Sequence, residues 1–212
     1  LYLIYGEKFY KRLNYDWKKF PSRTEIIKNI ISHKKYSTYL EIGCDQDENF
    51  SKIDLKEKIG VDPKSGGTHR MTSDTFFKSN KKKFDFIYVD GLHTYEQAIK
   101  DIKNALVFLN ENGIILLHDC LPKKIWNQIV PRIYGHWNGD VWKAIVETRT
   151  WNHVDTVTII ADHGLGLIKK NKNSNILMDK IKNFKKLKYK DYYTKHQKYM
   201  NPINFEDLHK VI

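Results

Sequence analysis

Short apolar runs alternate with longer amphipathic segments through most of this chain of 212 residues. The apolar runs lie at residues 39–42, 58–61, 84–89 and 113–118, and their lengths are typical of buried strands. Residues 22–33 and 94–109 instead carry apolar side chains at helical spacing, and Ser22 with Glu25 forms a capping box at the start of the first segment. This alternation predicts a mainly parallel sheet with helices on both faces.

Two late apolar runs, at residues 156–161 and 165–169, depart from this alternation. Only three residues separate them, too few for a parallel crossover, so we predict an antiparallel hairpin. We expect one compact domain in which an N-terminal helical segment (residues 1–35) precedes a central α/β domain (36–170). A lysine-rich helical C-terminal extension (171–212) follows.

The formal net charge of +12 is concentrated near the C-terminus. Residues 169–198 hold eleven lysines against two aspartates, a local balance of +9. The basic residues are mostly lysine, whereas arginine usually dominates phosphate and base recognition. A solvated tail is therefore favoured over nucleic-acid binding, while an acidic partner or a membrane surface is the alternative.

The chain contains no apolar run near 18 residues, so we expect no membrane span. Residues 1–5 are apolar but lack a basic leader and a cleavage site, which makes them a poor signal peptide. Cys44 and Cys120 are too few for a disulfide framework. These features together predict a cytoplasmic protein.

Polar residues follow each predicted strand, where ligands bind in open α/β sheets. After the first strand, Glu41-Ile42-Gly43 leads into three acids, Asp45, Asp47 and Glu48. These acids would repel a pyrophosphate, but they suit a ligand that carries a sulfonium and an ammonium, such as S-adenosylmethionine. Alternatively, they only complement the dipole of a following helix.

Asp62 follows the second strand, 21 residues beyond Glu41, a spacing at which an acidic residue reaches ribose hydroxyls. The alternative role for Asp62 is that of a turn former. Ser73 or Asp74, after a short expected third strand, is a candidate contact for the adenine amino group. The alternative is that they cap the helix that follows, and the two roles can coexist.

Asp90 and His93 follow the strand at 84–89, and His118 and Asp119 follow the strand at 113–118. Adjacent strands lie about 5 Å apart, so these four side chains are expected to converge. They could bind a divalent cation, or supply a histidine base with a pKa near neutrality. Alternatively, His93 caps a helix and His118 packs in the core.

The chain resembles the class I methyltransferases, and in particular bacterial enzymes of polysaccharide and glycosyl modification. The similarity covers residues 36–170 and depends on YLEIG, VDP, TSDTFF, FDFIYVDGLHTYEQAIKDI and GIILLHDCLP, with VDGLHTYE and LLHDCLP as its most specific pieces. It implies a Rossmann-like sheet of about seven strands whose last hairpin is antiparallel. The predicted cofactor-binding residues are Glu41, Gly43, Cys44, Asp62, Pro63, Ser73, Asp74 and Asp90.

The resemblance also implies that His93 serves as base, and we expect Asp90 and Asp119 to position the acceptor hydroxyl directly or through a metal. Asp90, His118 and Asp119 are the implied ligands of a divalent cation, magnesium or manganese. Many relatives carry an acid at the position of His118, so the histidine shifts the preference towards manganese or zinc, or leaves the site without a metal. The chain also lacks the usual loop glycine at position 47.

An alcohol is a poor nucleophile, so methyl transfer to oxygen needs a base or a metal ion, and the Asp/His cluster meets that need. The predicted function is O-methylation of a sugar or another small polar acceptor, which Tyr95, Trp137, Trp142 and Lys143 would contact; buried tryptophans are the alternative. The competing hypotheses are a nucleic-acid methyltransferase, a noncatalytic S-adenosylmethionine-binding module and, more distantly, a nicotinamide oxidoreductase. A homo-oligomer is left open.

Overall fold

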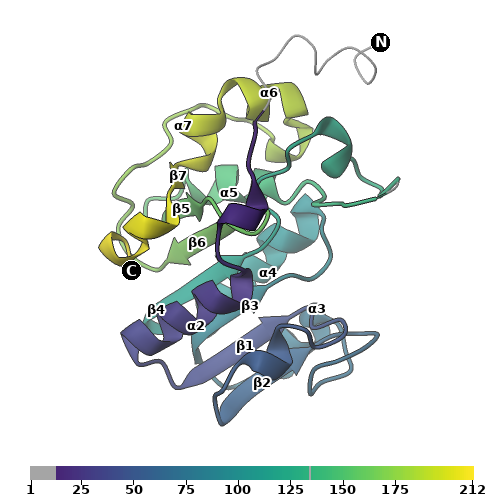
Figure 1. The fold of residues 1–212 in the computed structure, drawn as a ribbon, viewed down its shortest axis with the longest axis vertical. Helices are drawn as coiled ribbons and strands as arrows, with labels where there is room; N and C mark the ends of the chain where they lie inside the picture. The colour runs from purple at the N-terminus through teal and green to yellow at the C-terminus, as the bar shows by residue number, and fades with distance from the viewer. Residues whose placement is uncertain (1–12, 134) are drawn as a thin grey trace.

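A single seven-stranded sheet forms the centre of the computed structural model, which describes residues 13–133 and 135–212 (Figure 1). The strand order is β2-β1-β3-β4-β6-β5-β7. The strands are β1 (Thr38–Ile42), β2 (Glu57–Val61), β3 (Phe84–Val89), β4 (Leu109–Leu117), β5 (Asp155–Ile159), β6 (Leu165–Lys169) and β7 (Pro202–Ile203). Strands β2, β1, β3 and β4 pair in parallel, while β6 is antiparallel to both β4 and β5. The predicted hairpin at the end of a mainly parallel sheet is confirmed.

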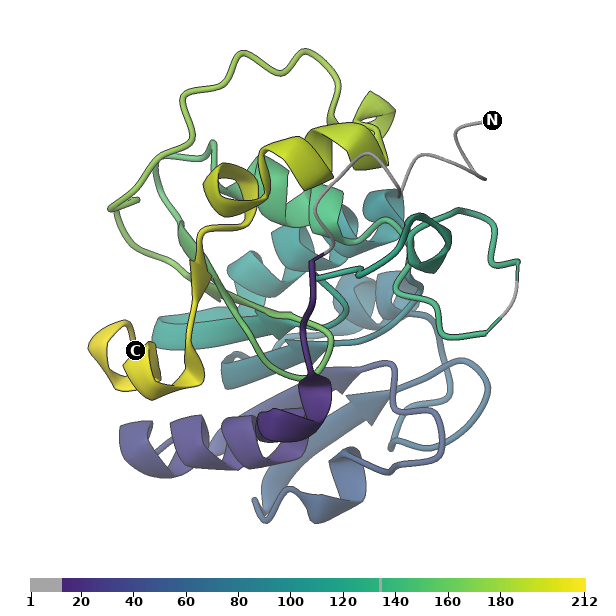
Figure 2. The same cartoon turned by 45° about the horizontal axis from the view of Figure 1, so that its top comes forward.

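Helices cover both faces of the sheet (Figures 1 and 2). The α-helices are α2 (Arg23–Lys34), α3 (Ser73–Ser79), α4 (Tyr95–Phe108), α5 (Trp142–Thr148), α6 (Tyr189–Thr194) and α7 (His196–Met200). Short 3-10 helices are η2 (Trp17–Lys19), η3 (Phe50–Lys52), η4 (Ile125–Asn127), η5 (Phe184–Lys186) and η6 (Phe205–Lys210). Helix α2 begins at the predicted capping box, in which the Ser22 side chain accepts from Glu25 N–H and the Glu25 carboxylate accepts from Ser22 N–H.

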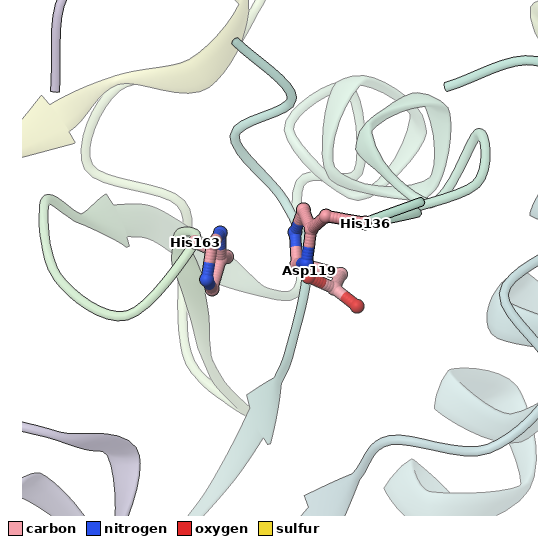
Figure 3. Close-up of side chains that lie close together, drawn as sticks. All are labelled: Asp119, His136 and His163. Carbon is pink, nitrogen blue, oxygen red and sulfur yellow. The ribbon is translucent and has the colours of Figure 1, made fainter. Parts of the chain in front are cut away.

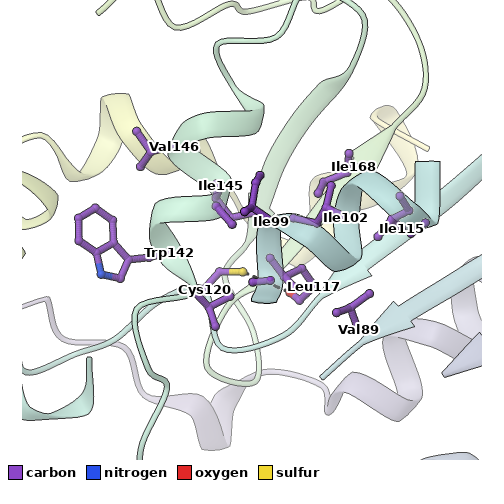
Figure 4. Close-up of a cluster of buried hydrophobic side chains, with 14 of the residues drawn as sticks. Val89, Ile99, Ile102, Ile115, Leu117, Cys120, Trp142, Ile145, Val146 and Ile168 are labelled. Carbon is purple, nitrogen blue, oxygen red and sulfur yellow. Dashed lines mark hydrogen bonds between the residues drawn. The ribbon is translucent and has the colours of Figure 1, made fainter. Parts of the chain in front are cut away.

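Alternate residues of the strands pack into two separate cores, because successive side chains of a strand point to opposite faces. On one face, four isoleucines of α2 pack against residues such as Tyr39 and Phe86. On the other, α3, α4 and α5 form a core with Leu40, Ile42 and Ile87 of the sheet, and α6 and α7 extend this core over α5. Figure 4 shows the central part of this second core, where α4 and α5 meet the sheet. The cores hold the parallel strand ends in a fixed arrangement on which the site is built.

Two expected elements are absent from the described residues. The expected third strand is reduced to an isolated bridge between Val61 and His69, because Gly66 and Gly67, both at positive φ, turn the chain back towards β2. Between β1 and β2 the connection contains only the 3-10 helix η3 and no α-helix. The count of seven strands is reached instead through β7, which the sequence pattern did not predict.

The C-terminal segment is built into the domain. Strand β7 pairs in parallel with β5, and Tyr192 of α6 contacts the Trp142 ring of α5 at a centroid distance of 5.0 Å. In the described ranges, no helix has the length and apolar character needed to cross a bilayer. Residues 1–12, which include the apolar start of the predicted N-terminal segment, lie outside the described residues.

Candidate functional site

A cavity of about 770 Å³ opens at the carboxyl ends of β1, β2, β3 and β4. It brings together every residue predicted to bind the cofactor: Glu41, Gly43, Cys44, Asp62, Pro63, Ser73, Asp74 and Asp90. His93, His118, Asp119 and Trp137 line the same cavity. The residues that follow the parallel strands therefore form one site.

Gly43 allows the ends of β1 and β3 to approach closely. Its φ is +88°, and a Cβ atom at this position would lie 2.1 Å from the carbonyl oxygen of Asp90. Any larger residue would therefore overlap the β3 end, which makes Gly43 the one glycine of the loop that the local geometry requires.

Glu41 is buried at the inner end of the cavity, with 1% of its surface exposed. Its Oε2 accepts hydrogen bonds from the Tyr39 hydroxyl at 2.5 Å and from the Asn49 amide at 2.8 Å. Burial nevertheless raises the pKa of Glu41 to about 7, since desolvation outweighs these two hydrogen bonds. Glu41 can thus change its charge near neutral pH.

The acidic loop after β1 differs in detail from the expectation. Asp45 and Glu48 line the cavity, whereas the Asp47 carboxylate accepts a hydrogen bond from Gly67 N–H at 2.7 Å. Asp45 and Asp47 have positive φ, at +46° and +60°, so Asp47 takes the left-handed conformation that a glycine usually supplies. No α-helix follows the loop, so the acids do not cap a helix dipole.

Asp62 is held rigidly at the end of β2. Its carboxylate accepts hydrogen bonds from the backbone N–H groups of Lys64 (2.7 Å), Ser65 (3.0 Å) and Asp45 (3.1 Å). Burial opposes ionisation, but these hydrogen bonds lower the pKa of Asp62 below its usual value. Asp62 is thus an ionised acceptor at a fixed position.

Ser73 and Asp74 begin α3, but Thr72 is the residue that caps this helix. Gln97 of α4 donates to both Ser73 Oγ and Asp74 Oδ1, each at 3.2 Å, and Lys100 pairs with Asp74 at 2.5 Å. The capping alternative for Ser73 and Asp74 therefore does not hold.

The four predicted groups at the ends of β3 and β4 do converge. His93 Nε2 lies 3.2 Å from Asp90 Oδ1, and His93 Nδ1 lies 3.1 Å from Asp119 Oδ2. His118 Nδ1 lies 3.1 Å from Asp90 Oδ1 and 3.7 Å from Asp119 Oδ2. His93 and His118 thus alternate with two carboxylates, so neither histidine is an isolated helix cap or core residue.

Asp162, in the β5–β6 turn, completes this network and was not predicted from the sequence. His118 Nε2 lies 2.9 Å from the Asp162 carbonyl oxygen and 3.5 Å from its carboxylate. Although burial opposes charge on both groups, the Asp90 carboxylate raises the pKa of His118 well above its usual value and His118 lowers that of Asp90. Arg23, at the start of α2, donates its backbone N–H to the Asp162 carboxylate at 2.6 Å.

The segment between β4 and α5 covers the cluster. The Trp137 ring stacks on His93 at a centroid distance of 5.3 Å, and Asn138 donates to Asp119 Oδ1 at 2.6 Å. A Cβ atom on Gly139 would lie 1.6 Å from the His93 carbonyl oxygen, so the segment packs directly on the residue that carries the imidazole.

Of the four predicted acceptor contacts, Trp137 is the one that lines the cavity. Trp142 is fully buried in the α5 core, and Lys143 forms an ion pair with Asp140 at 2.9 Å. The Tyr95 hydroxyl donates to Glu147 at 2.5 Å. These three residues face the packing around α5, whereas Arg132 and His136, which were not predicted, line the cavity.

Residues 35–120 match the family model described as "Methyltransferase domain". This stretch contains β1 to β4 and the strand ends that line the cavity. Residues 35–120 form a class I methyltransferase domain. Enzymes of this class depend on S-adenosylmethionine, the ligand that the acidic loop and Asp62 predicted.

Several solved structures are similar to this chain in fold. An S-adenosylhomocysteine-bound methyltransferase of Podospora anserina, PaMTH1, is 17% identical with a TM-score of 0.54, covering 80% of this chain and 93% of its own. A putative O-methyltransferase of Klebsiella pneumoniae is 10% identical with a TM-score of 0.54, covering 72% and 84%.

A third structure is the S-adenosylmethionine-bound CalS10 of Micromonospora echinaspora, an amino pentose methyltransferase involved in calicheamicin biosynthesis. It is 10% identical with a TM-score of 0.51, covering 70% of this chain and 90% of its own. At these identities, the similarities show that the chain shares the fold of these proteins. No curated protein matches the sequence of the chain.

The described part of the methyltransferase contains two sets of potential metal ligands whose donor atoms lie within 4.8 Å of one another. One set is Asp90, His93 and Asp119, and the other is Asp119, His136 and His163. The second set lies between the β4 end, the covering segment and the β5–β6 turn (Figure 3).

Proposed function

We propose that this methyltransferase transfers the methyl group of S-adenosylmethionine to a hydroxyl oxygen of a sugar or another small polar acceptor. The observation that carries the proposal is the position of His93, an imidazole held between two carboxylates in the wall of the cofactor cavity. Methyl transfer to oxygen requires that the acceptor lose a proton, and a positioned histidine is the side chain best suited to take it near neutral pH.

The surroundings of His93 indicate which nitrogen accepts this proton. Nδ1 lies 3.2 Å from the Trp137 carbonyl oxygen, which can only accept a hydrogen bond, so Nδ1 carries hydrogen. Nε2, 3.2 Å from Asp90 Oδ1, donates to that carboxylate when the ring is charged and is the basic nitrogen when the ring is neutral, so the acceptor hydroxyl would lie beside it, next to Asp90. Asp119 holds the ring orientation and stabilises the imidazolium that forms, as the carboxylate of a catalytic triad does.

The opposite end of the cavity suits the cofactor. The carboxylates of Asp45 and Glu48 favour a ligand with sulfonium and ammonium charges. The Asp62 carboxylate, held at the end of β2 by backbone N–H groups, is the proposed acceptor for a ribose hydroxyl. Ser73 and Asp74 are the proposed contacts of the adenine.

Two of the similar solved structures support this choice of acceptor: CalS10 is an amino pentose methyltransferase, and the Klebsiella protein is a putative O-methyltransferase. Trp137 adds a partly exposed aromatic face beside His93. Aromatic faces suit the apolar faces of sugar rings, and the neighbouring carboxylates suit hydroxyl groups.

The predicted cation ligands Asp90, His118 and Asp119 are compatible with a divalent ion in donor type. Two carboxylates and one imidazole suit manganese or zinc better than magnesium. His118 Nε2 faces the Asp162 carbonyl oxygen, as the outer nitrogen of a metal-bound histidine commonly does, and Nδ1 faces both carboxylates. An ion there would acidify an acceptor hydroxyl, and it would have to replace the proton on Nδ1.

The test is methyl transfer from radiolabelled S-adenosylmethionine to a panel of sugars and oligosaccharides, with a catechol, DNA and RNA as comparators. The proposal predicts a methyl ether on a sugar hydroxyl, and loss of transfer in His93→Ala while S-adenosylhomocysteine affinity stays within a few-fold. Label found only on the catechol or the nucleic acids would contradict the sugar assignment, and label on nitrogen would contradict O-methylation. Repeating the assay with a chelator, and then with added manganese, tests the cation.

A further inference from the structure

His136 and His163 meet at the edge of the methyl-transfer site, where His136 lines the cofactor cavity and His163 lies outside it. His136 lies in the segment that covers His93, and His163 lies in the β5–β6 turn. Their rings are 3.9 Å apart between centroids at an interplanar angle of 29°. Figure 3 shows both imidazoles beside Asp119, which follows the end of β4.

The two imidazoles have no hydrogen-bond partner among the side chains and backbone groups that the structure describes, so their ring nitrogens are available to a ligand. One donor atom from each of Asp119, His136 and His163 lies within 4.8 Å of the other two. Three chain segments that are distant in sequence thus place a carboxylate and two imidazoles around one point.

We propose that Asp119, His136 and His163 form a binding site for a divalent transition-metal ion of the zinc type. Two imidazoles and one carboxylate are a common ligand set for such ions, and three protein ligands leave a coordination position open. Ligand atoms around zinc lie about 2 Å from the ion, so the donor atoms must draw closer together than they lie here, and the exposed His136 can turn out of its stack on His163 to allow this.

The site lies between two cavities. Asp119 and His136 line the cofactor cavity, while His136 and His163 line a second cavity of about 380 Å³ together with Trp17, Lys123 and Trp126. An ion there would share Asp119 with His93, whose Nδ1 is 3.1 Å from Asp119 Oδ2. This site differs from the set predicted from the sequence, because it uses neither Asp90 nor His118.

The test is calorimetric titration of the whole protein with zinc, in the wild type and in single histidine variants. The proposal predicts that His136→Gln and His163→Gln each weaken zinc binding by about tenfold or more. His153→Gln, an exposed histidine beside Trp151, is the matched control and should bind as the wild type does. His118→Gln should retain zinc binding at this site, because His118 belongs to the separate set proposed for the methyl-transfer cation.

Three results would overturn the proposal: no zinc binding by the wild type, unchanged affinity in His136→Gln and His163→Gln, or a loss confined to His118→Gln. S-adenosylhomocysteine binding verifies that each variant is folded. If His163→Gln fails this control, His136→Gln still decides the question, because His136 is exposed and its replacement leaves the core intact.

Discussion

Glu41 and Asp62 are carboxylic acids at neighbouring strand ends, yet their surroundings shift their pKa values in opposite directions. Glu41 is buried and receives two side-chain hydrogen bonds, which do not compensate for desolvation. Asp62 receives three backbone hydrogen bonds, which do. The sequence predicted both residues from their place after a strand, but the pKa of each depends on partners that the spacing does not reveal.

Glu41→Gln should change how stability depends on pH. The folded protein keeps the Glu41 proton up to a pKa of about 7, whereas the unfolded chain releases it near 4.5. Between these values the folded state binds more protons, so this group makes the wild type less stable as pH rises. Between pH 4 and pH 8, the free energy of unfolding of Glu41→Gln should rise by up to about 3 kcal/mol relative to that of the wild type, as measured by urea unfolding. The exposed Glu57→Gln is the control, and identical pH dependence in Glu41→Gln and the wild type would contradict this assignment.

The pH profile of methyl transfer should report the environment of His93. Burial opposes protonation, but the hydrogen bond to Asp90 and the charge of Asp119 raise the pKa of His93 above 6.5. Two further groups lie close by: the Trp137 carbonyl oxygen beside His93 Nδ1, and His118, which shares the Asp90 carboxylate with His93. Since the base must be neutral, kcat/KM should rise with a midpoint above 6.5, and Asp119→Asn should move that midpoint to lower pH. A midpoint unaffected by Asp119→Asn would show that Asp119 does not raise the pKa of the base.

Several residues of the site could not be predicted from the sequence. Asp90, His93, His118 and Asp119 follow regular strands, so their convergence follows from the parallel sheet. Asp162, His136 and His163 lie in a turn and an irregular segment whose paths no periodicity specifies. The predicted acceptor contacts divide for the same reason: Trp137 lines the cavity, whereas Trp142 and Lys143 begin a short helix that is buried along its whole length.

At the scale of elements, the site depends on the close approach of β1 and β3. Their parallel pairing puts Ile42 opposite Val89, so Gly43 and Asp90 come next to each other. The apolar runs predicted these strands within a residue or two. The third strand and a helix after β1 were not found, because glycine-rich turns and a 3-10 helix complete those connections.

Gly43→Ala should disrupt the cofactor cavity more than its positive φ alone accounts for. Placing alanine at positive φ costs about 1–2 kcal/mol, and here the methyl group would also overlap the Asp90 carbonyl. We expect at least about tenfold weaker S-adenosylhomocysteine binding by calorimetry, because about 1.4 kcal/mol suffices for that change. Gly135→Ala is the matched control: its φ is +65° and nothing lies within 4 Å of the added methyl group. Equal cofactor binding by the two variants would contradict the close approach.

At the scale of the whole molecule, the C-terminal segment is part of the fold rather than a separate appendage. It supplies β7 at the sheet edge, α6 and α7 over α5, and Leu208 in the core beneath α2. Its lysines are partly balanced by nearby acids, as in the pairs of Lys185 with Glu96 and Lys195 with Asp179. The sequence indicated helices and charge here, but it could not indicate that a two-residue strand would pair with β5.

Leu208→Ala should therefore destabilise the entire domain. Leu208 is fully buried, and removing a buried leucine side chain typically costs about 2–5 kcal/mol. Chemical unfolding should show this loss in one cooperative transition, with Lys210→Ala, an exposed neighbour, close to the wild type. A change of less than about 1 kcal/mol in Leu208→Ala would mean that the segment contributes little to the core.

The most direct test of the account is the rate of methyl transfer by His93→Gln at saturating S-adenosylmethionine, measured beside the wild type on the same acceptor. Glutamine is close to histidine in size but cannot act as a base at neutral pH. We expect a rate at least about 100-fold lower, the usual contribution of a general base, with S-adenosylhomocysteine affinity within a few-fold of the wild type. A rate equal to that of the wild type would show that His93 does not take the acceptor proton.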